Sequence, residues 1–353
     1  MSTLTKAMPR KPTRNYALDA IKVLFAVSVA LGHFQIGFLS SNTVVECFFI
    51  LSGFFLVQSF HGGRYEDAYH YSKMRIKRIY PYYMTAFMIL FLYLNRNALT
   101  DIVNLFDGLI SSLPELLFLQ NIGIFNGGIN YPLWQLCVLI VVSHIWFACL
   151  SWNHQMTINV VCPIVAVTTL TFLANTYDTH TVDIFTVESK VFYVPLIRAA
   201  GFVAIGMMLW KPINGVQEYL QHVKGNHVIV TLLSLGSIWA FWRHQWDYVA
   251  HIAFVFIMIC SLSCYGLLSF ALNRRVFRIG EKFSLSVYLN HALIIYIINN
   301  HFAYWKNDAA RLELILVFLG VLFLYSGLFI LIIDGIKKLR CILRNGNTSK
   351  KEE

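Results

Sequence analysis

The sequence predicts an all-α integral membrane protein with about ten transmembrane helices and both termini in the cytoplasm. Of the 353 residues, 57% are hydrophobic and only 13% are charged, whereas about 25% are charged in an ordinary soluble domain. The apolar residues gather in runs of the roughly 20 residues that a helix needs to cross a bilayer. Basic residues fall in short segments between these runs, as in multi-pass membrane proteins. This distribution excludes a cytosolic enzyme, a disordered protein and a nucleic-acid binder, despite the net charge of +10.

Ten apolar runs define the predicted spans. The second, third and fifth runs are short, so their ends are less well defined. Residues 98–125 are also apolar, but Asp101, Asp107, Pro114 and Glu115 interrupt them, and we interpret this stretch as an interfacial or re-entrant segment. The predicted spans are 17–39, 43–60, 79–95, 131–151, 157–174, 191–210, 226–243, 248–272, 283–302 and 312–336.

The distribution of Lys and Arg supports this count. With the N-terminus inside, 21 of the 28 basic residues lie in cytoplasmic segments, 5 lie on the opposite side and 2 lie within spans. Such a bias is the positive-inside pattern. We therefore expect a basic cytoplasmic tail at 1–16, a polytopic membrane domain at 17–336 and a second basic cytoplasmic tail at 337–353. The segment 1–16 has no small-residue cleavage site, so we do not interpret it as a signal peptide.

The seven cysteines are scattered, mostly within apolar runs, and form no CxxC pair. This spacing predicts neither structural disulfides nor a metal site.

The first span carries three ionisable residues, Asp19, Lys22 and His33. Charged groups inside a membrane are costly, so each is a functional candidate. At 100° per residue the three lie in one stripe about 60° wide, with Lys22 and His33 roughly 16 Å apart along the axis. A cation at the cytoplasmic entrance and a proton-transfer group deeper inside suit an anionic substrate threaded along the helix. The alternative is a snorkelling Asp19–Lys22 pair and a packed core histidine.

Two further motifs carry charge next to spans. Glu46, at the start of the second span, lies near the predicted depth of His33. It therefore either orients that imidazole, as in a triad, or is an exposed interfacial acid.

Arg75 and Arg78 are three residues apart at the start of a helix and are predicted to face the same way. Guanidinium pairs bind phosphate well, although topology alone also places basic residues at such positions.

Polar side chains also follow one face of the ninth span. Ser284, Tyr288 and His291 occur at i, i+4 and i+7, which is either a structural polar seam or part of a site. Ser52, followed by Gly53, is interpreted first as a helix-packing position, because no GxSxG elbow accompanies it. Other polar or aromatic candidates, each interpreted as structural before catalytic, are Trp134, His144, Arg198 and His251.

Together these motifs resemble the integral-membrane acyltransferase family 3, whose members O-acylate carbohydrates and some other acceptors. The family's first helix reads L-D-x-L-R with a His eleven residues later, here residues 18–22 and His33. Its second helix has an acid before F-F-x-L-S-G-F, here Glu46 and residues 48–54. R-x-x-R-I-x-P corresponds to residues 75–81, and S-x-S-x-Y-L-x-H corresponds to residues 284–291. The four motifs follow in family order, as in a standalone member without an appended SGNH-type domain.

Two positions depart from the family pattern. Lys22 stands where members usually have Arg, which keeps the charge but loses the bidentate fork. A W-x-L-x-x-E pattern would align with residues 134–139, and Leu139 stands at the position of the acid.

The resemblance implies a chemistry and a role for the charged residues. It implies an acyl-CoA donor, most often acetyl-CoA, bound from the cytoplasm, and no metal. Arg75 and Arg78, with Lys22 nearby, are then the residues expected to bind the phosphates of CoA. His33 is expected to be the general base that activates an acceptor hydroxyl, because imidazole titrates near neutrality.

Further roles follow from the same resemblance. Asp19 is expected to position Lys22, and Glu46 is expected to orient His33. A transient acyl-His33 is the alternative to direct transfer. The other site candidates are Ser52, Trp134, Tyr288 and His291.

The resemblance also implies an acceptor and a location. We expect a hydroxyl of a bacterial cell-surface polysaccharide or its lipid-linked precursor (O-antigen, exopolysaccharide or capsule), modified by a multi-pass protein of the bacterial inner membrane. The expected partners are acyl-CoA, this carbohydrate and the lipid bilayer, with no nucleic acid; no oligomeric state is predicted. The alternatives are an acyltransferase for a small metabolite and a transporter or flippase for an anionic glycolipid. A transporter should show an inverted repeat, and the sequence shows none.

Overall fold

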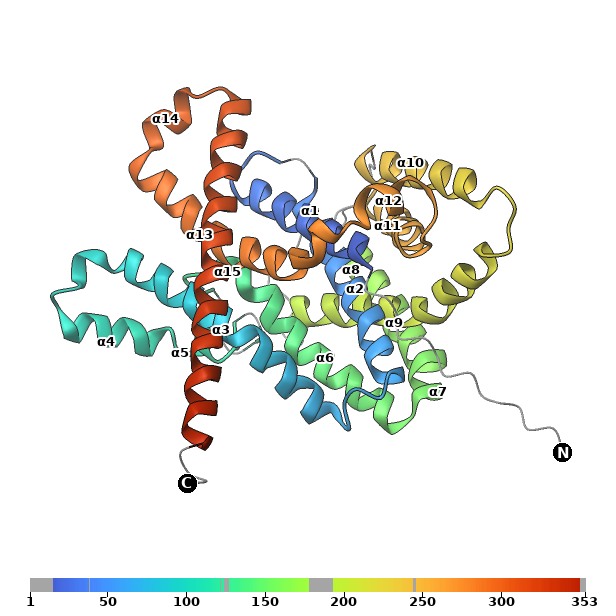
Figure 1. The fold of residues 1–353 in the computed structure, drawn as a ribbon, viewed down its shortest axis with the longest axis horizontal. Coiled ribbons are helices and arrows are strands. Elements are labelled where there is room, and N and C mark those ends of the chain that lie inside the picture. Colours follow the sequence, from blue (N-terminus) through green and yellow to red (C-terminus); the bar gives the residue numbers. More distant parts are fainter. Residues whose placement is uncertain are drawn as a thin grey trace.

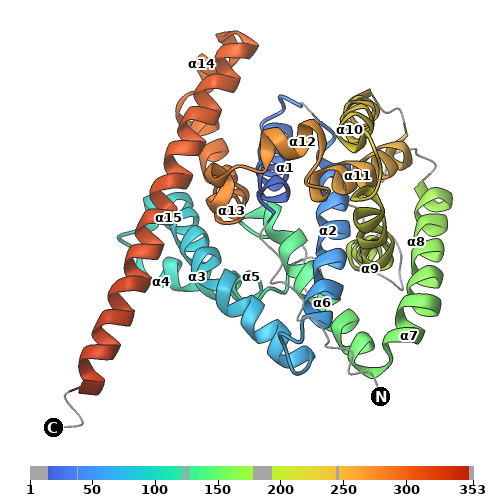
Figure 2. The same cartoon turned by 45° about the vertical axis from the view of Figure 1, so that its right-hand side comes forward.

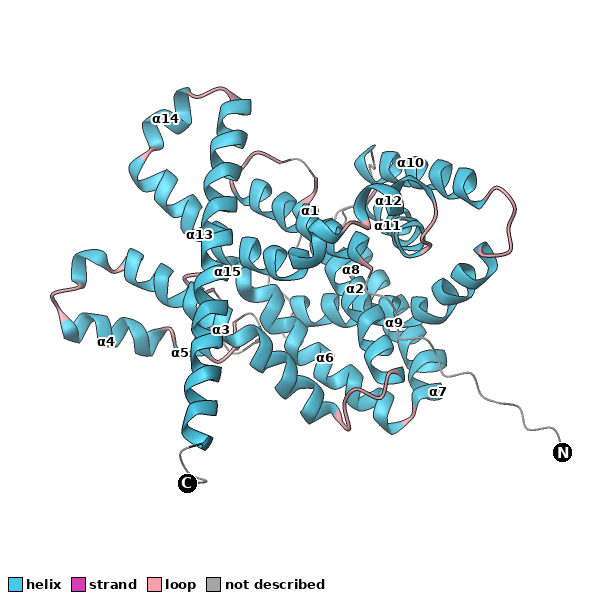
Figure 3. Ribbon diagram, viewed as in Figure 1, coloured by secondary structure: helices cyan, strands magenta, loops and turns pink. Residues whose placement is uncertain are grey.

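The computed structural model describes residues 15–37, 39–120, 122–123, 127–177, 193–243 and 246–349. This part of the chain is helical, with loops and turns but no strand (Figure 3). The long helices are α1 Tyr16–His33, α2 Ser41–His61, α3 Ala68–Leu94, α6 Trp134–Trp152, α8 Cys162–Tyr177, α9 Val194–Leu220, α10 Asn226–Arg243, α11 Asp247–Leu262, α13 Gly280–His301 and α15 Arg311–Ser349. The short elements are η1 Arg96–Ala98, α4 Ile102–Ser111, α5 Leu113–Leu116, η2 Tyr131–Leu133, α7 His154–Met156, η3 Thr157–Val161, α12 Gly266–Leu272, η4 Arg275–Ile279 and α14 Ala303–Asp308.

Helices occupy all ten predicted spans, but not all are equally apolar. Six candidate membrane spans are found among the described residues, or seven if α11 and α12 form one broken span. Helices α3, α10 and α13 are long enough to cross a membrane, but they carry too many polar residues to be counted as candidate spans. The all-helical membrane fold therefore agrees with the sequence, while the count of about ten spans stays a prediction.

Several helix ends differ from the sequence prediction for local reasons. Helix α3 begins at Ala68, ahead of Arg75 and Arg78 and of the predicted span 79–95, because the Asp67 side chain accepts a hydrogen bond from the His70 N–H and caps the helix. Helix α1 ends at His33 rather than residue 39, and Gln35 follows with a positive φ of 65°. The predicted span 248–272 is two helices bent by 66°. Cys264, with a positive φ of 59°, lies at this break.

Helix α1 lies at the centre of the molecule. Its Leu18, Phe25 and Val29 side chains belong to one large apolar cluster, formed mainly with α2, α6, α9 and α11. Its Ala26 and Phe34 side chains belong to a second cluster, formed with α3, α13 and α15. Helix α8 and helix α15 lie at opposite edges of the bundle (Figure 2). Both halves of the bundle therefore pack around the helix that carries the predicted charged stripe.

Helices α1 and α13 run side by side in the same direction. A Cβ atom on Gly280, at the start of α13, would lie 3.0 Å from the carbonyl oxygen of Asp19 near the start of α1. Farther along, the rings of His33 and His291 lie 5.3 Å apart. This parallel packing brings the end of the charged stripe against the polar face of α13.

The segment between α3 and α6, which the sequence predicts to be interfacial or re-entrant, contains only short helices among its described residues. Helix α4 has no buried residue among its ten positions and is too short to span a bilayer. It extends outward from the bundle next to α3 (Figure 1). From α5 the chain returns into the bundle; the buried residue Glu115 lies in α5, and the buried residues Gln120 and Asn130 lie after it.

The C-terminal segment continues the last long helix. Helix α15 extends without a break to Ser349, so residues 337–349 of the predicted basic tail at 337–353 are helical. Of the predicted N-terminal tail at 1–16, residues 1–14 lie outside the described residues, as do residues 350–353.

Candidate functional site

The charged stripe of α1 begins with an ion pair. Lys22 Nζ lies 3.5 Å from Asp19 Oδ1, and the Lys22 side chain is 19% exposed. The same ammonium lies 4.7 Å from the centroid of the Phe55 ring on α2, a cation–π distance. Asp19 is buried. The structure thus brings Asp19 and Lys22 together, as the expected positioning of Lys22 by Asp19 requires.

His33, the last residue of α1, meets two aromatic side chains from distant parts of the chain. Its ring stacks on His291 of α13 at a centroid distance of 5.3 Å and an interplanar angle of 20°. The ring of Tyr131 in η2 meets it edge-on at 5.1 Å. His33 therefore lies where α1, α13 and the return into α6 converge, and the structure brings His33 and His291 into one site.

Hydrogen bonds to the backbone fix the polar face of α13. His291 is fully buried, and its Nδ1 lies 2.8 Å from the carbonyl oxygen of Tyr288. The Tyr288 hydroxyl donates to the carbonyl oxygen of Pro132 in η2. Tyr288 thereby ties α13 to the segment that carries Tyr131. Of the predicted residues on this face, His291 contacts His33 directly, and Tyr288 is next to His291 with ring centroids 6.0 Å apart.

The return segment before η2 is held by two buried side chains that sequence reasoning did not single out for a site. The Glu115 carboxylate accepts hydrogen bonds from the backbone N–H groups of Ile129 (2.8 Å) and Asn130 (3.0 Å). Burial raises the pKa of Glu115 to about 7, while these two donors favour its ionised form. The Gln120 amide donates to the carbonyl oxygens of Asn130 and Tyr131.

Close packing leaves little freedom in this return. Gly128 has a positive φ of 138°, and a Cβ there would lie 2.7 Å from Gln120 Nε2 and 2.8 Å from Glu115 Oε2. Only glycine fits this backbone conformation without strain. The sequence signal that could have identified this return segment is an acid and an amide, Glu115 and Gln120, in an apolar stretch that ends in two consecutive glycines.

Glu46 does not contact His33 as expected. One carboxylate oxygen accepts from Arg198 Nε at 2.8 Å, and the other lies 2.6 Å from His251 Nε2. All three side chains are buried. Arg198 also donates to the carbonyl oxygen of Asn42 at 3.2 Å. Both carboxylate oxygens of Glu46 therefore have partners, Arg198 and His251, which were interpreted from the sequence as structural residues. The expected orientation of His33 by Glu46 is not observed.

Arg75 and Arg78 point to different neighbours. Arg75 Nη1 donates to the Tyr71 hydroxyl at 2.9 Å and to Ser143 Oγ on α6 at 2.8 Å. Arg78 Nη1 lies 3.1 Å from Glu281 Oε1 on α13, and the Arg78 side chain is 66% exposed. The two guanidinium groups are close in sequence but do not form one clamp in this structure.

The remaining predicted residues occupy packing positions. Ser52 is half-buried and precedes Gly53, where a Cβ would lie 2.0 Å from the carbonyl oxygen of Val203 on α9. Trp134 is buried, and its ring meets Phe49 edge-on at 6.4 Å. The Ser52–Gly53 step thus belongs to a close helix contact, as the packing interpretation expects.

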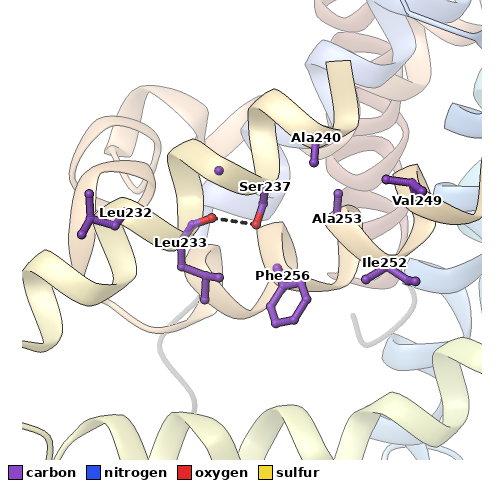
Figure 4. A pocket seen from close by; sticks show the side chains of 9 residues that line it. Leu232, Leu233, Ser237, Ala240, Val249, Ile252, Ala253 and Phe256 are labelled. Atoms are coloured by element: carbon purple, nitrogen blue, oxygen red, sulfur yellow. Dashed lines mark hydrogen bonds between the residues drawn. The ribbon is translucent and has the colours of Figure 1, made fainter. Parts of the chain in front are cut away.

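A pocket of about 340 Å³ lies elsewhere, between α10 and α11 (Figure 4). Its walls are almost entirely aliphatic or aromatic, and its polar side chain, Ser237, donates to the Leu233 carbonyl oxygen. None of the predicted site residues lines it. Within the described ranges no group of three His, Cys, Asp or Glu side chains is arranged to hold a metal ion.

Comparison with known proteins assigns a family to nearly the whole chain. A family model described as an acyltransferase domain matches residues 15–333. This range includes every residue of the site described above. No curated protein and no solved structure matches the chain significantly.

Proposed function

Because the chain belongs to this acyltransferase family, we propose that it is a multi-pass membrane O-acyltransferase that transfers an acetyl group from acetyl-CoA to a hydroxyl of a bacterial cell-surface glycan or its lipid-linked precursor. Family membership supports acyl transfer in a membrane. The donor, the acceptor and the catalytic base are our inference. The observation that carries the inference is the position of His33, at the junction of α1, α13 and η2 beside His291 and Tyr131.

The proposed chemistry is direct transfer with His33 as the general base. His33 accepts the proton of the acceptor hydroxyl as its oxygen attacks the thioester carbonyl. The tetrahedral intermediate then collapses, the C–S bond breaks, and the proton passes from His33 to the leaving thiolate of CoA. The products are an O-acyl ester and free CoA.

The cytoplasmic ends of α1 and α3 would bind the donor. Arg78 is exposed and held by one ion pair, which at a surface contributes about 0–1 kcal/mol, so a phosphate can replace Glu281. Arg75 uses only Nη1 in its hydrogen bonds to described residues, which leaves Nε and Nη2 as donors. Lys22 lies on the stripe between this face and His33. These positions support binding of the CoA phosphates, with the pantetheine arm directed along α1.

The direct test measures base-released acetate from purified surface glycan. A deletion strain, the restored strain and a strain restored with His33→Ala are compared. We expect the acetate to return with the natural protein and to fall at least a hundredfold with His33→Ala, because general-base catalysis contributes about 10²- to 10⁴-fold. His222→Ala, at an exposed histidine, is the matched control and should restore the acetate fully.

Membrane abundance of each variant is measured alongside. Acetate that is the same in all strains would remove surface-glycan acetylation as the function. Full acetate with His33→Ala at equal abundance would remove His33 as the base.

A further inference from the structure

Three buried polar atoms, on the segment leading into η2 and on α13, have no hydrogen-bond partner among the described residues. They are Gln120 Oε1, Asn130 Oδ1 and His291 Nε2. Their side chains are at most 1% exposed. Buried polar atoms in folded proteins are nearly always paired, so three unpaired atoms on segments joined by hydrogen bonds need an explanation.

Whether each unpaired amide atom is an oxygen or a nitrogen follows from the hydrogen bond that the other polar atom of the same amide makes. Gln120 Nε2 lies 3.3 Å from the carbonyl oxygen of Tyr131. Asn130 Nδ2 lies 3.0 Å from the carbonyl oxygen of Leu289. A carbonyl oxygen can only accept, so the amide group facing it must be the NH₂. The unpaired atoms are therefore oxygens, which are acceptors.

The same reasoning assigns the tautomer of His291. Its Nδ1 lies 2.8 Å from the carbonyl oxygen of Tyr288, so Nδ1 carries the proton. In the neutral ring Nε2 then presents a lone pair. All three unpaired atoms are hydrogen-bond acceptors.

The three side chains form one unit with the predicted base. Gln120 holds the backbone of Asn130 and Tyr131, and Asn130 is bonded to Leu289, two residues before His291. The His291 and Tyr131 rings both contact the ring of His33. The matching ligand carries several O–H donors close together and no negative charge, because an anion would be repelled by neutral acceptors.

Resting on the function proposed above, we propose that Gln120, Asn130 and His291 bind the hydroxyl groups of the acceptor and present one of them to His33. The acceptor class is a compound with neighbouring hydroxyls, as in a saccharide. The three residues are binding residues for the acceptor, not for acyl-CoA.

The test uses two substitutions at His291 that separate its two nitrogens. In His291→Asn the amide nitrogen takes the place of Nδ1 and keeps the bond to Tyr288, but the Nε2 lone pair is lost. His291→Gln places an amide oxygen near the position of Nε2. The purified full-length protein is assayed with acetyl-CoA and oligosaccharide prepared from base-treated surface glycan, and KM is measured for each substrate.

We expect His291→Asn to raise the acceptor KM about tenfold, the effect of losing one hydrogen bond of ordinary strength, with the acetyl-CoA KM unchanged within twofold. His291→Gln should recover most of the acceptor KM. Gln120→Met, which removes a second acceptor atom at similar side-chain length, should raise the same KM. Tyr325→Phe removes another unpaired buried polar atom, on α15, and should change neither KM.

An acceptor KM that is unchanged in His291→Asn and Gln120→Met, or an equal rise in both KM values, would overturn the proposal and leave buried water as the partner of these atoms. If a variant is inactive, calorimetric titration with the same oligosaccharide decides: a tenfold weaker Kd supports the proposal and an equal Kd overturns it. If the natural protein forms no ester at all, the proposed function has failed, rather than the acceptor site alone.

Discussion

At the scale of single residues, one buried carboxylate is shared by two partners. Glu46 accepts from Arg198 and lies 2.6 Å from His251, and all three side chains are buried. Breaking a buried pair by removing one partner is costly because a charge is left uncompensated, whereas replacing both partners can be nearly neutral. The cluster therefore joins α2, α9 and α11 with a strength that depends on all its members.

We expect Arg198→Met to lower the free energy of unfolding by about 3–5 kcal/mol, because Glu46 keeps its charge without its guanidinium partner. The double variant Arg198→Met with Glu46→Leu should lose less than the sum of the single changes. Thermal unfolding of the purified protein in detergent measures both effects.

Arg64→Met is the matched control, because Arg64 is exposed; it should stay within about 0.5 kcal/mol of the natural protein. Equal unfolding temperatures for Arg64→Met and Arg198→Met would show that the buried pair contributes nothing to stability.

The same residues show the limit of prediction at this scale. The stripe of Asp19, Lys22 and His33 was predicted because helical spacing alone places residues on one face. The partner of His33 was not, since His291 lies 258 positions away and periodicity contains no information about which helices meet. Glu46 was expected to face His33 on the basis of its predicted depth, and in the structure its carboxylate contacts Arg198 and His251 instead.

At the scale of helices, α2 and α9 approach each other closely through two glycines. A Cβ on Gly53 would lie 2.0 Å from the Val203 carbonyl oxygen, and one on Gly206 would lie 1.9 Å from the Ile50 carbonyl oxygen. Small residues allow such backbone contact between membrane helices. This contact sets the position of Glu46 relative to Arg198, because the two residues lie on these same helices.

We expect Gly206→Ala to lower the free energy of unfolding by about 1–3 kcal/mol, because the added methyl group meets backbone that cannot turn away. Gly215→Ala, in the same helix and with no atom within 4 Å of its Cβ position, should be neutral or stabilising by up to about 1 kcal/mol. Thermal unfolding of the two variants side by side makes the comparison. Equal free-energy changes in the two variants would mean that the close contact at Gly206 makes no contribution to stability.

Helix existence was predictable along the chain, and helix ends less so. Each of the ten apolar ranges contains a helix because burial in lipid or protein selects for apolar runs of that length. The caps at Asp67 and the break at Cys264 were missed, because they depend on a side-chain hydrogen bond and on packing of α12 beside α10. The interruptions in residues 98–125 predicted that this stretch is not a regular span, and its assignment as interfacial or re-entrant stays a prediction. The contacts of Glu115 and Gln120 with backbone groups could not be predicted, because no pattern of side chains displays them.

At the scale of the whole molecule, the parallel packing of α1 and α13 constrains the topology. Asp19 lies against Gly280 and His33 lies against His291, so both helices begin at the same face. The chain must then cross the membrane an even number of times between residue 16 and residue 280. The ten predicted spans give eight crossings before α13. The helices that are long and apolar enough to be candidate spans give five crossings before α13, or six if α11 and α12 form one broken span. Eight and six are both even numbers, so both assignments are compatible with parallel α1 and α13 helices. The distribution of Lys and Arg favours the ten-span assignment.

Cysteine labelling tests this arrangement. Cys341 is exposed on the final part of α15, and Asp308 is exposed between α13 and α15. In a Cys264→Ser background we expect Cys341 to react in spheroplasts only with a membrane-permeant maleimide, because basic residues hold this end of α15 in the cytoplasm. Asp308→Cys should react with an impermeant maleimide. The reverse pattern would invert the molecule in the membrane, and His33 would then lie near the cytoplasmic face. Reaction of both positions from one side would mean that α15 does not cross the membrane, although the even number of crossings before α13 would still hold.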